Sequence, residues 1–173
     1  MNYQTWLAAV PPEITQDKLW LMEVYRVALF IGDLAWFDIV KLSENRRMIR
    51  LSDQLFAAAG SISANIAEGY GRSSTKDQIR FYEYSLGSAR ETRNWYFQSR
   101  FVLGEIVASH RIRLVTSSVR QLLTIIPSER GYKLKEDDVP YASAEGIDLH
   151  ELLNNVPLPD SPVSYAPRTT HHA

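Results

Sequence analysis

The residues best suited to chemistry lie in one short stretch, "NIAEGYGRSS", which begins at Asn65. Glu68 and Arg72 stand four residues apart, in the order that favours an ion pair on a helix. The glycines, arginine and hydroxyl groups could also bind an anion, because free amides at a helix start favour phosphate. Their spacing differs from that of a Walker loop. Two interpretations stay open: an anion site, and a polar clasp that fixes a helix corner, with Arg72 paired to Glu68 or Glu91.

Catalytic chemistry has little support elsewhere in the chain. His110 is the one histidine before the C-terminal region, and no nucleophile motif surrounds it. The Glu-x-x-His pairs of di-iron helical proteins do not occur. Glu68 and Glu91 could hold a divalent ion, but as buried carboxylates near Arg72 they are better explained as paired charges. We therefore expect no catalytic residue, no metal site and no cofactor.

Basic residues are in excess over the middle of the chain, where residues 41–120 hold 13 Lys and Arg against 7 Asp and Glu. Arginine suits bidentate phosphate contacts, and it equally suits salt bridges between subunits. Arg93 and Arg100 lie seven apart near Trp95, Phe97 and Phe101, and this mixture could stack nucleic-acid bases. The same aromatic residues could instead belong to the core or to a subunit interface. The candidate nucleic-acid contacts are Arg46, Arg50, Lys76, Arg80, Arg93, Arg100, Arg113 and Arg120.

The composition is that of a single soluble domain. The chain has 173 residues, 45% of them hydrophobic and 23% charged, and it contains no cysteine. Its N-terminus lacks the features of a signal peptide. The most apolar run, residues 19–37, is interrupted by Glu23, Arg26 and Asp33, so it does not predict a membrane span. We expect a cytoplasmic protein.

The elements that position these residues are helices. Apolar residues recur at steps of three and four over 16–42, from about 45 to Gly69, over 75–103 and over 106–126. Gly69 and Gly71 predict a left-handed helix end. Ser73, Ser74 and Thr75 are N-cap candidates for the next helix, and Thr75 has capping-box spacing to Gln78. Pro127 is expected just beyond the last helix. The fold class is all-α: an antiparallel up-down four-helix bundle over 15–127, preceded by a leader over 1–14.

The chain after the bundle, residues 128–173, is acidic and rich in proline, with 8 Asp and Glu against 4 Lys and Arg beyond residue 126. It reads as an irregular tail. Within it, Leu149, Leu152, Leu153 and Val156 form an apolar stripe that predicts a short helix near 147–156, with Asp148 as its cap. Such a helix is marginal alone, so it should dock on its own bundle, on a neighbouring subunit or on another protein.

The stretches "SISANIAEGYGRSS" and "FYEYSLGSARET" resemble the signature of the bacterial four-helix bundle proteins named after intervening sequences in 23S ribosomal RNA genes. The resemblance covers roughly residues 17–127, while the leader and the acidic tail depart from it. The matching motif positions are Asn65, Glu68, Gly69, Arg72, Gly87, Ser88 and Glu91.

The resemblance implies an antiparallel bundle that assembles into a homo-oligomer, commonly a ring of five, and it implies no known reaction. Members are similar to accessory proteins of diversity-generating retroelements, which engage a reverse transcriptase and its nucleic acid. The resulting hypothesis is a non-enzymatic accessory protein that binds RNA or DNA. The alternative is a protein-interaction module that uses the tail helix and has no role with nucleic acid.

Overall fold

The computed structural model describes residues 2–130 and 148–160, and every regular element within them is a helix. The predicted all-α class is confirmed. None of the described helices combines the length and the hydrophobicity that a membrane crossing needs. The helices are α1 (Tyr3–Ala9), α2 (Pro12–Thr15), the 3-10 helix η1 (Lys18–Leu21), α3 (Glu23–Ser43), α4 (Ile49–Tyr70), α5 (Thr75–Leu103), α6 (Glu105–Glu129) and α7 (Leu149–Asn154).

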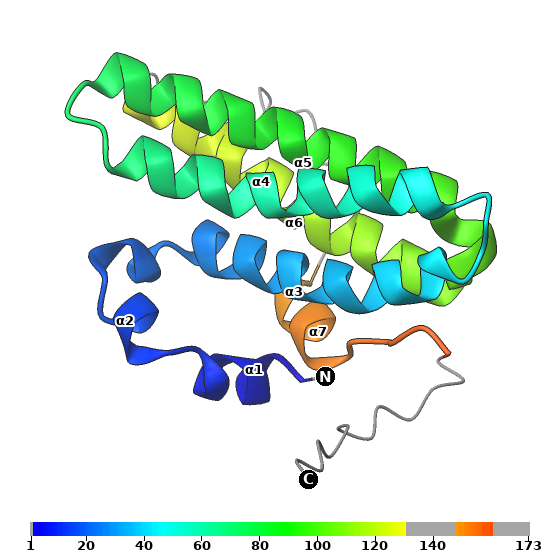
Figure 1. The fold of residues 1–173 in the computed structure, drawn as a ribbon. Helices are drawn as coiled ribbons and strands as arrows, with labels where there is room; N and C mark the ends of the chain where they lie inside the picture. The colour runs from blue at the N-terminus through cyan, green and yellow to red at the C-terminus, as the bar shows by residue number, and fades with distance from the viewer. Residues whose placement is uncertain (1, 131–147, 161–173) are drawn as a thin grey trace, which may run out of the picture.

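Four long helices, α3 to α6, form the body of the molecule and lie side by side (Figure 1). The connections between them are short, so helices that follow each other in sequence pack together, whereas α3 meets α6 over a smaller contact. The α3–α4 connection and the break at Gly104 lie at one end of the body, which we call the Gly104 end. The α4–α5 connection lies at the opposite end, the Gly71 end.

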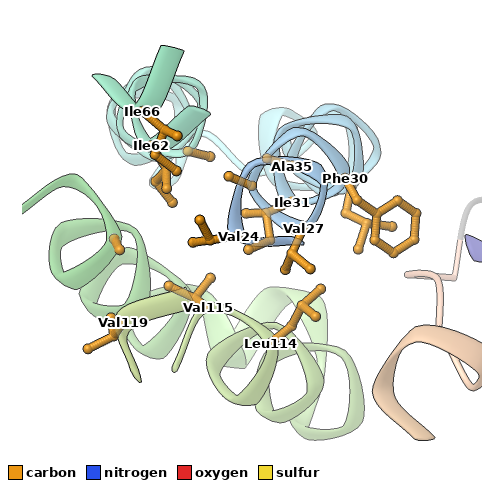
Figure 2. Close-up of a cluster of buried hydrophobic side chains, with 14 of the residues drawn as sticks. Val24, Val27, Phe30, Ile31, Ala35, Ile62, Ile66, Leu114, Val115 and Val119 are labelled. Carbon is orange, nitrogen blue, oxygen red and sulfur yellow. The ribbon is translucent and has the colours of Figure 1, made fainter. Parts of the chain in front are cut away.

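The core fills the space between these helices with aliphatic side chains. Val24 and Ile31 of α3 project toward Ile62 of α4 and Val115 of α6 (Figure 2). All four side chains are buried. Burial of an aliphatic side chain of this size contributes about 1.5–3 kcal/mol, so the apolar stripes stabilise the packing of the helices.

The predicted leader contributes to the core. Tyr3 and Trp6 of α1 are buried, and their ring centroids lie 5.0 and 5.1 Å from that of Phe30. The Trp6 indole N–H also donates to Asp33 at 2.6 Å. The predicted helix start at residue 16 is wrong, because η1 and the extended residue Met22 precede α3. The chain reverses through α2 and η1, so that α1 lies back against α3 (Figure 1).

Three expectations about helix ends are also wrong. Gly71 keeps a right-handed conformation, with φ of −76°. The capping box of Thr75 and Gln78 does not form: the N-cap candidate Ser74 precedes α5 without a side-chain bond, and Gln78 donates instead to the Tyr82 hydroxyl at 3.2 Å. Pro127 lies inside α6, which continues to Glu129. A proline near a helix end removes only one backbone bond, and the final turn forms around it.

The tail helix α7 packs against α6 and α1, and it lies below α3 in Figure 1. The Asp148 carboxylate caps it by accepting from the Glu151 amide at 3.2 Å. Leu152 is buried, and Leu149, Leu153 and Val156 pack against the core at its edge. The rest of the predicted irregular tail, 131–147 and 161–173, lies outside the described residues.

Candidate functional site

A buried ion pair and a tyrosine hydroxyl link three helices. The Arg111 guanidinium of α6 donates to both carboxylate oxygens of Asp38 on α3, through Nε at 2.8 Å and Nη2 at 3.1 Å. Tyr96 of α5 donates its hydroxyl to the same carboxylate at 2.9 Å. All three side chains are at most 1% exposed. Burial, followed by the charge of Asp38, raises the pKa of Tyr96 well above 10, so its phenol stays a donor.

Arg111 and its neighbour His110, which extends this cluster, also hold the tail. Arg111 Nη2 donates to the carbonyl of Pro157 at 2.9 Å. Arg111 Nη1 lies 2.9 Å from His110 Nδ1, and a guanidinium can only donate, so Nδ1 is the acceptor. His110 Nε2 therefore carries the proton and donates to the carbonyl of Leu152 at 2.8 Å.

His110 is held in its neutral form by these surroundings. Burial lowers its pKa to about 4, the charges of Arg111 and Arg113 act in the same direction, and the bond to Leu152 opposes them. Both ring nitrogens are already engaged. A hollow of about 560 Å³ opens beside His110 between α6 and α7, but the imidazole has no spare atom to offer a ligand there.

Sequence reasoning missed this cluster. Arg111 is one of the 13 basic residues that give residues 41–120 their positive charge, whereas the structure buries and pairs it. A signal was present, because Arg111 falls on the apolar stripe of α6 with Val107 and Val115, and Asp38 falls on that of α3 with Leu34. Opposite charges at core positions of two helices indicate a buried pair. The cluster joins α3, α5 and α6, and its two charged groups, Asp38 and Arg111, pair with each other.

The motif residues lie mostly at the surface. Glu68 and Arg72 form an ion pair, as one interpretation expected, but both side chains are about half exposed. Glu91 is exposed too and accepts from the Trp95 indole. The expectation of buried carboxylates is therefore wrong. Asn65 donates to the carbonyl of Ser61 on its own helix.

The glycines of the motif differ from each other. A Cβ on Gly69 would lie 2.9 Å from the ring of Tyr82 and 3.1 Å from the carbonyl oxygen of Gln78, so Gly69 allows α4 and α5 to approach closely. Gly87 faces open space, and the neighbouring Ser88 donates to the carbonyl of Tyr84. Within the motif, the close packing of the helices therefore depends on Gly69. Among the described residues no group of acidic or histidine side chains could hold a metal ion.

The candidate nucleic-acid contacts are divided between the two ends and the flank. At the Gly71 end, Arg80 pairs with Asp77 at 3.1 Å, and Lys76 lies beside them. Arg46 and Arg50 are exposed at the Gly104 end. Arg93, Arg113 and Arg120 lie along α5 and α6, between the ends.

Four arginines share the Gly104 end: Arg46, Arg47, Arg50 and Arg100. Within residues 2–130 and 148–160 no ion pair joins any of these four to a carboxylate. Lys41 and Glu44, nearby, pair with each other at 3.0 Å. A set of cations that keeps its charge at one end can attract an anionic polymer.

The aromatic residues near Arg100 point into solvent. Phe97 is 54% and Phe101 80% exposed, and the Arg100 guanidinium carbon lies 4.0 and 4.1 Å from their ring centroids. The core alternative for these two rings is therefore wrong. A second apolar patch lies on α3 and α4, where Trp36 and Phe56 are exposed with their ring centroids 5.8 Å apart.

Comparison with known proteins supports the resemblance drawn from the motifs. Residues 23–102 match the family model described as 23S rRNA-intervening sequence protein. The match spans α3, α4 and nearly all of α5, and it includes the motif around Glu68. No curated protein and no solved structure matches the chain.

Proposed function

We propose that this chain, whose residues 23–102 match the 23S rRNA-intervening sequence family, is a non-enzymatic accessory protein that binds nucleic acid in the cytoplasm. In this proposal α3 to α6 form an antiparallel up-down bundle that assembles with copies of itself. RNA or DNA would be bound through the arginines of the Gly104 end. By analogy with the accessory proteins that the family resembles, the complex would serve another protein, such as a reverse transcriptase.

The observation that carries the proposal is a difference between the two ends of the body in how many arginines are paired with carboxylates. At the Gly71 end, Arg72, Arg80 and Arg130 each pair with a nearby carboxylate. The four arginines of the Gly104 end have no such pairing among the described residues. Phosphates could take the place of the missing carboxylates, and guanidinium groups bind them in a bidentate manner.

Self-association is supported by the patch on α3 and α4. Trp36, Val40 and Phe56 are each at least 40% exposed, and large exposed apolar patches mark interaction sites. The resemblance favours five copies. A closed ring repeats one basic end at regular intervals, and the repeated charges add into a stronger field.

The tail helix does not favour the alternative function. Its central residue, Leu152, is buried against the same chain, and two buried side chains bind the tail backbone. These contacts support docking of the tail helix on its own bundle rather than on another protein. We place the partner surface on the bundle.

The test compares charge reversals at the two ends of the full-length protein. Arg46→Glu with Arg50→Glu should weaken binding of labelled RNA or DNA by about tenfold or more, because several phosphate contacts are lost. Arg80→Glu is the matched control, since its partner Asp77 already neutralises it. Wild-type binding should also fall at least tenfold between about 50 and 200 mM salt.

Light scattering on the same samples tests the assembly. A wild-type mass of several subunits is expected, and both charge variants should keep it. A wild-type protein that binds neither RNA nor DNA at low salt would disprove the nucleic-acid role. A monomeric mass would disprove the assembly.

A further inference from the structure

We propose that the C-terminal part of α5 is a stacking platform for single-stranded nucleic acid, with Phe97 and Phe101 receiving the faces of unpaired bases. This inference rests on the proposed function and narrows its ligand to a single strand. It assigns the recognition of bases to a site on α5 that adjoins the arginines of the Gly104 end.

The first observation is the exposure of two phenylalanines that the core does not use. Phe97 and Phe101 stand four residues apart on one face of α5, and more than half of each side chain contacts solvent. Phenylalanine has no polar atom that could hydrogen-bond to water, so each exposed ring presents an apolar face to which a ligand can bind. Two such faces in sequence are what successive bases need in order to stack.

The second observation is the cation between the rings. The Arg100 guanidinium lies 4.0 Å from the centroid of Phe97 and 4.1 Å from that of Phe101, and its Nη1 donates to the carbonyl of Phe97 at 2.6 Å. These contacts hold both rings and the charge in one arrangement. A phosphate that links two stacked bases would meet the guanidinium beside the rings.

The third observation is a hollow that continues the platform along α5. It has a volume of about 340 Å³ and is lined by Arg90, Arg93, Asn94, Phe97 and Ile112. Its lining combines two apolar side chains, two arginines and one amide that can donate to and accept from the edge of a base. A base stacked on Phe97 would lie at the mouth of this hollow.

Nucleic acid fits this surface better than a second copy of the chain does. In the patch on α3 and α4, the Trp36 and Phe56 rings contact each other. In the α5 patch, the Arg100 guanidinium contacts both phenylalanine rings. Covering Arg100 with an apolar protein surface would remove its charge from water at a high cost. A nucleic-acid strand supplies phosphates together with ring faces. A duplex keeps its base faces stacked inside, so a single strand suits the platform.

The experiment measures binding of the full-length protein to a labelled mixed-sequence single strand and to the matching duplex at low salt. Phe97→Ala with Phe101→Ala should lose about tenfold or more in affinity for the single strand, since stacking on each ring is removed. Duplex binding should stay within about twofold, because the arginines remain. Tyr84→Ala is the control, since Tyr84 is another exposed aromatic residue of α5, 53% exposed, that lies outside the platform.

The outcomes separate this inference from the proposed function. If the wild type binds neither probe, both fail. Suppose instead that the wild type binds nucleic acid. If the double variant keeps the wild-type affinity for both probes, or loses affinity for both by the same factor, only the stacking platform fails. A lower mass of the double variant in light scattering would assign the rings to an interface between copies, and this would also overturn the platform.

Discussion

Gly69 shows how one residue decides the approach of two helices. It lies in the last turn of α4, and the ring of Tyr82 and the carbonyl of Gln78 pack where a side chain would begin. Its backbone is helical, so the role of Gly69 is spatial rather than conformational. The surrounding polar residues, Glu68 and Arg72, form an exposed pair of the kind that contributes at most about 1 kcal/mol.

We expect Gly69→Ala to lower the free energy of unfolding by about 1–3 kcal/mol, because the added methyl group would overlap the Tyr82 ring and a backbone oxygen. Gly60→Ala is the matched control on the same helix. Nothing lies within 4 Å of its Cβ position, so this change should stabilise the helix by about 0.5–1 kcal/mol. Urea denaturation measures both. Equal effects at the two positions would contradict the close contact.

At the scale of elements, α7 depends on its partner helix α6. Six residues are too few for an independent helix, so α7 forms where Leu152 is buried and its carbonyl accepts from His110. That bond requires a proton on Nε2, while Nδ1 must stay free to accept from Arg111. Protonation of Nδ1 would place two donors against each other.

The docking of α7 should therefore depend on pH. The pKa of His110 is about 4 in the folded chain, below its ordinary value of 6.5, so the unfolded chain binds the extra proton first as the pH falls. The stability that His110 contributes is complete above pH 6.5 and is lost between pH 6.5 and 4. At pH 5 the loss should be about 2 kcal/mol relative to pH 8.

Urea denaturation of the wild type and of His110→Gln at pH 8 and pH 5 isolates this contribution. The variant lacks the titrating group, so its unfolding free energy should change less between the two pH values, by about 2 kcal/mol. His150→Gln is the control, because His150 is exposed on α7 and should leave the pH dependence unchanged. Identical pH dependence in all three proteins would contradict the role of His110.

At the scale of the whole molecule, α1 and α7, which lie far apart in the sequence, meet beside the small contact between α3 and α6. α3 and α6 touch over a small area, and α1 and α7 lie against this side of the body, α1 on α3 and α7 on α6. The family match excludes α1, α6 and α7. Asp38 and Arg111 join α3 to α6 beneath this cover, and Arg111 also binds the tail.

Removing one partner of this pair should affect the entire fold. Arg111→Met leaves the Asp38 carboxylate buried without its cation and should lower the free energy of unfolding by about 3–5 kcal/mol. Combining it with Asp38→Leu removes the stranded charge and should recover at least half of the loss. Arg90→Met, on an exposed arginine, should change stability by less than about 0.5 kcal/mol. If the double variant lost as much free energy of unfolding as Asp38→Leu and Arg111→Met lose together as single variants, the two residues would not be coupled.

Much of the architecture could be predicted from the sequence. The apolar stripes at steps of three and four residues placed the long helices, since a helix must bury such a stripe whatever its partner is. The motif around Glu68 indicated a resemblance to the 23S rRNA-intervening sequence proteins, and their family model matches residues 23–102. The short stripe from Leu149 and its cap at Asp148 indicated α7 for the same local reason. These features depend on neighbours in sequence.

The tertiary structure decided which polar residues are inside. Glu68 and Arg111 are both charged residues on helices, but one lies in solvent and the other is 1% exposed, because burial depends on what packs opposite. The same holds for Gly69, whose neighbours come from α5, and for Phe97 and Phe101, which no element covers among the described residues. Periodicity assigns a residue to a face of its helix, but only the packing of helices distant in sequence determines whether that face meets the core, a charge or water.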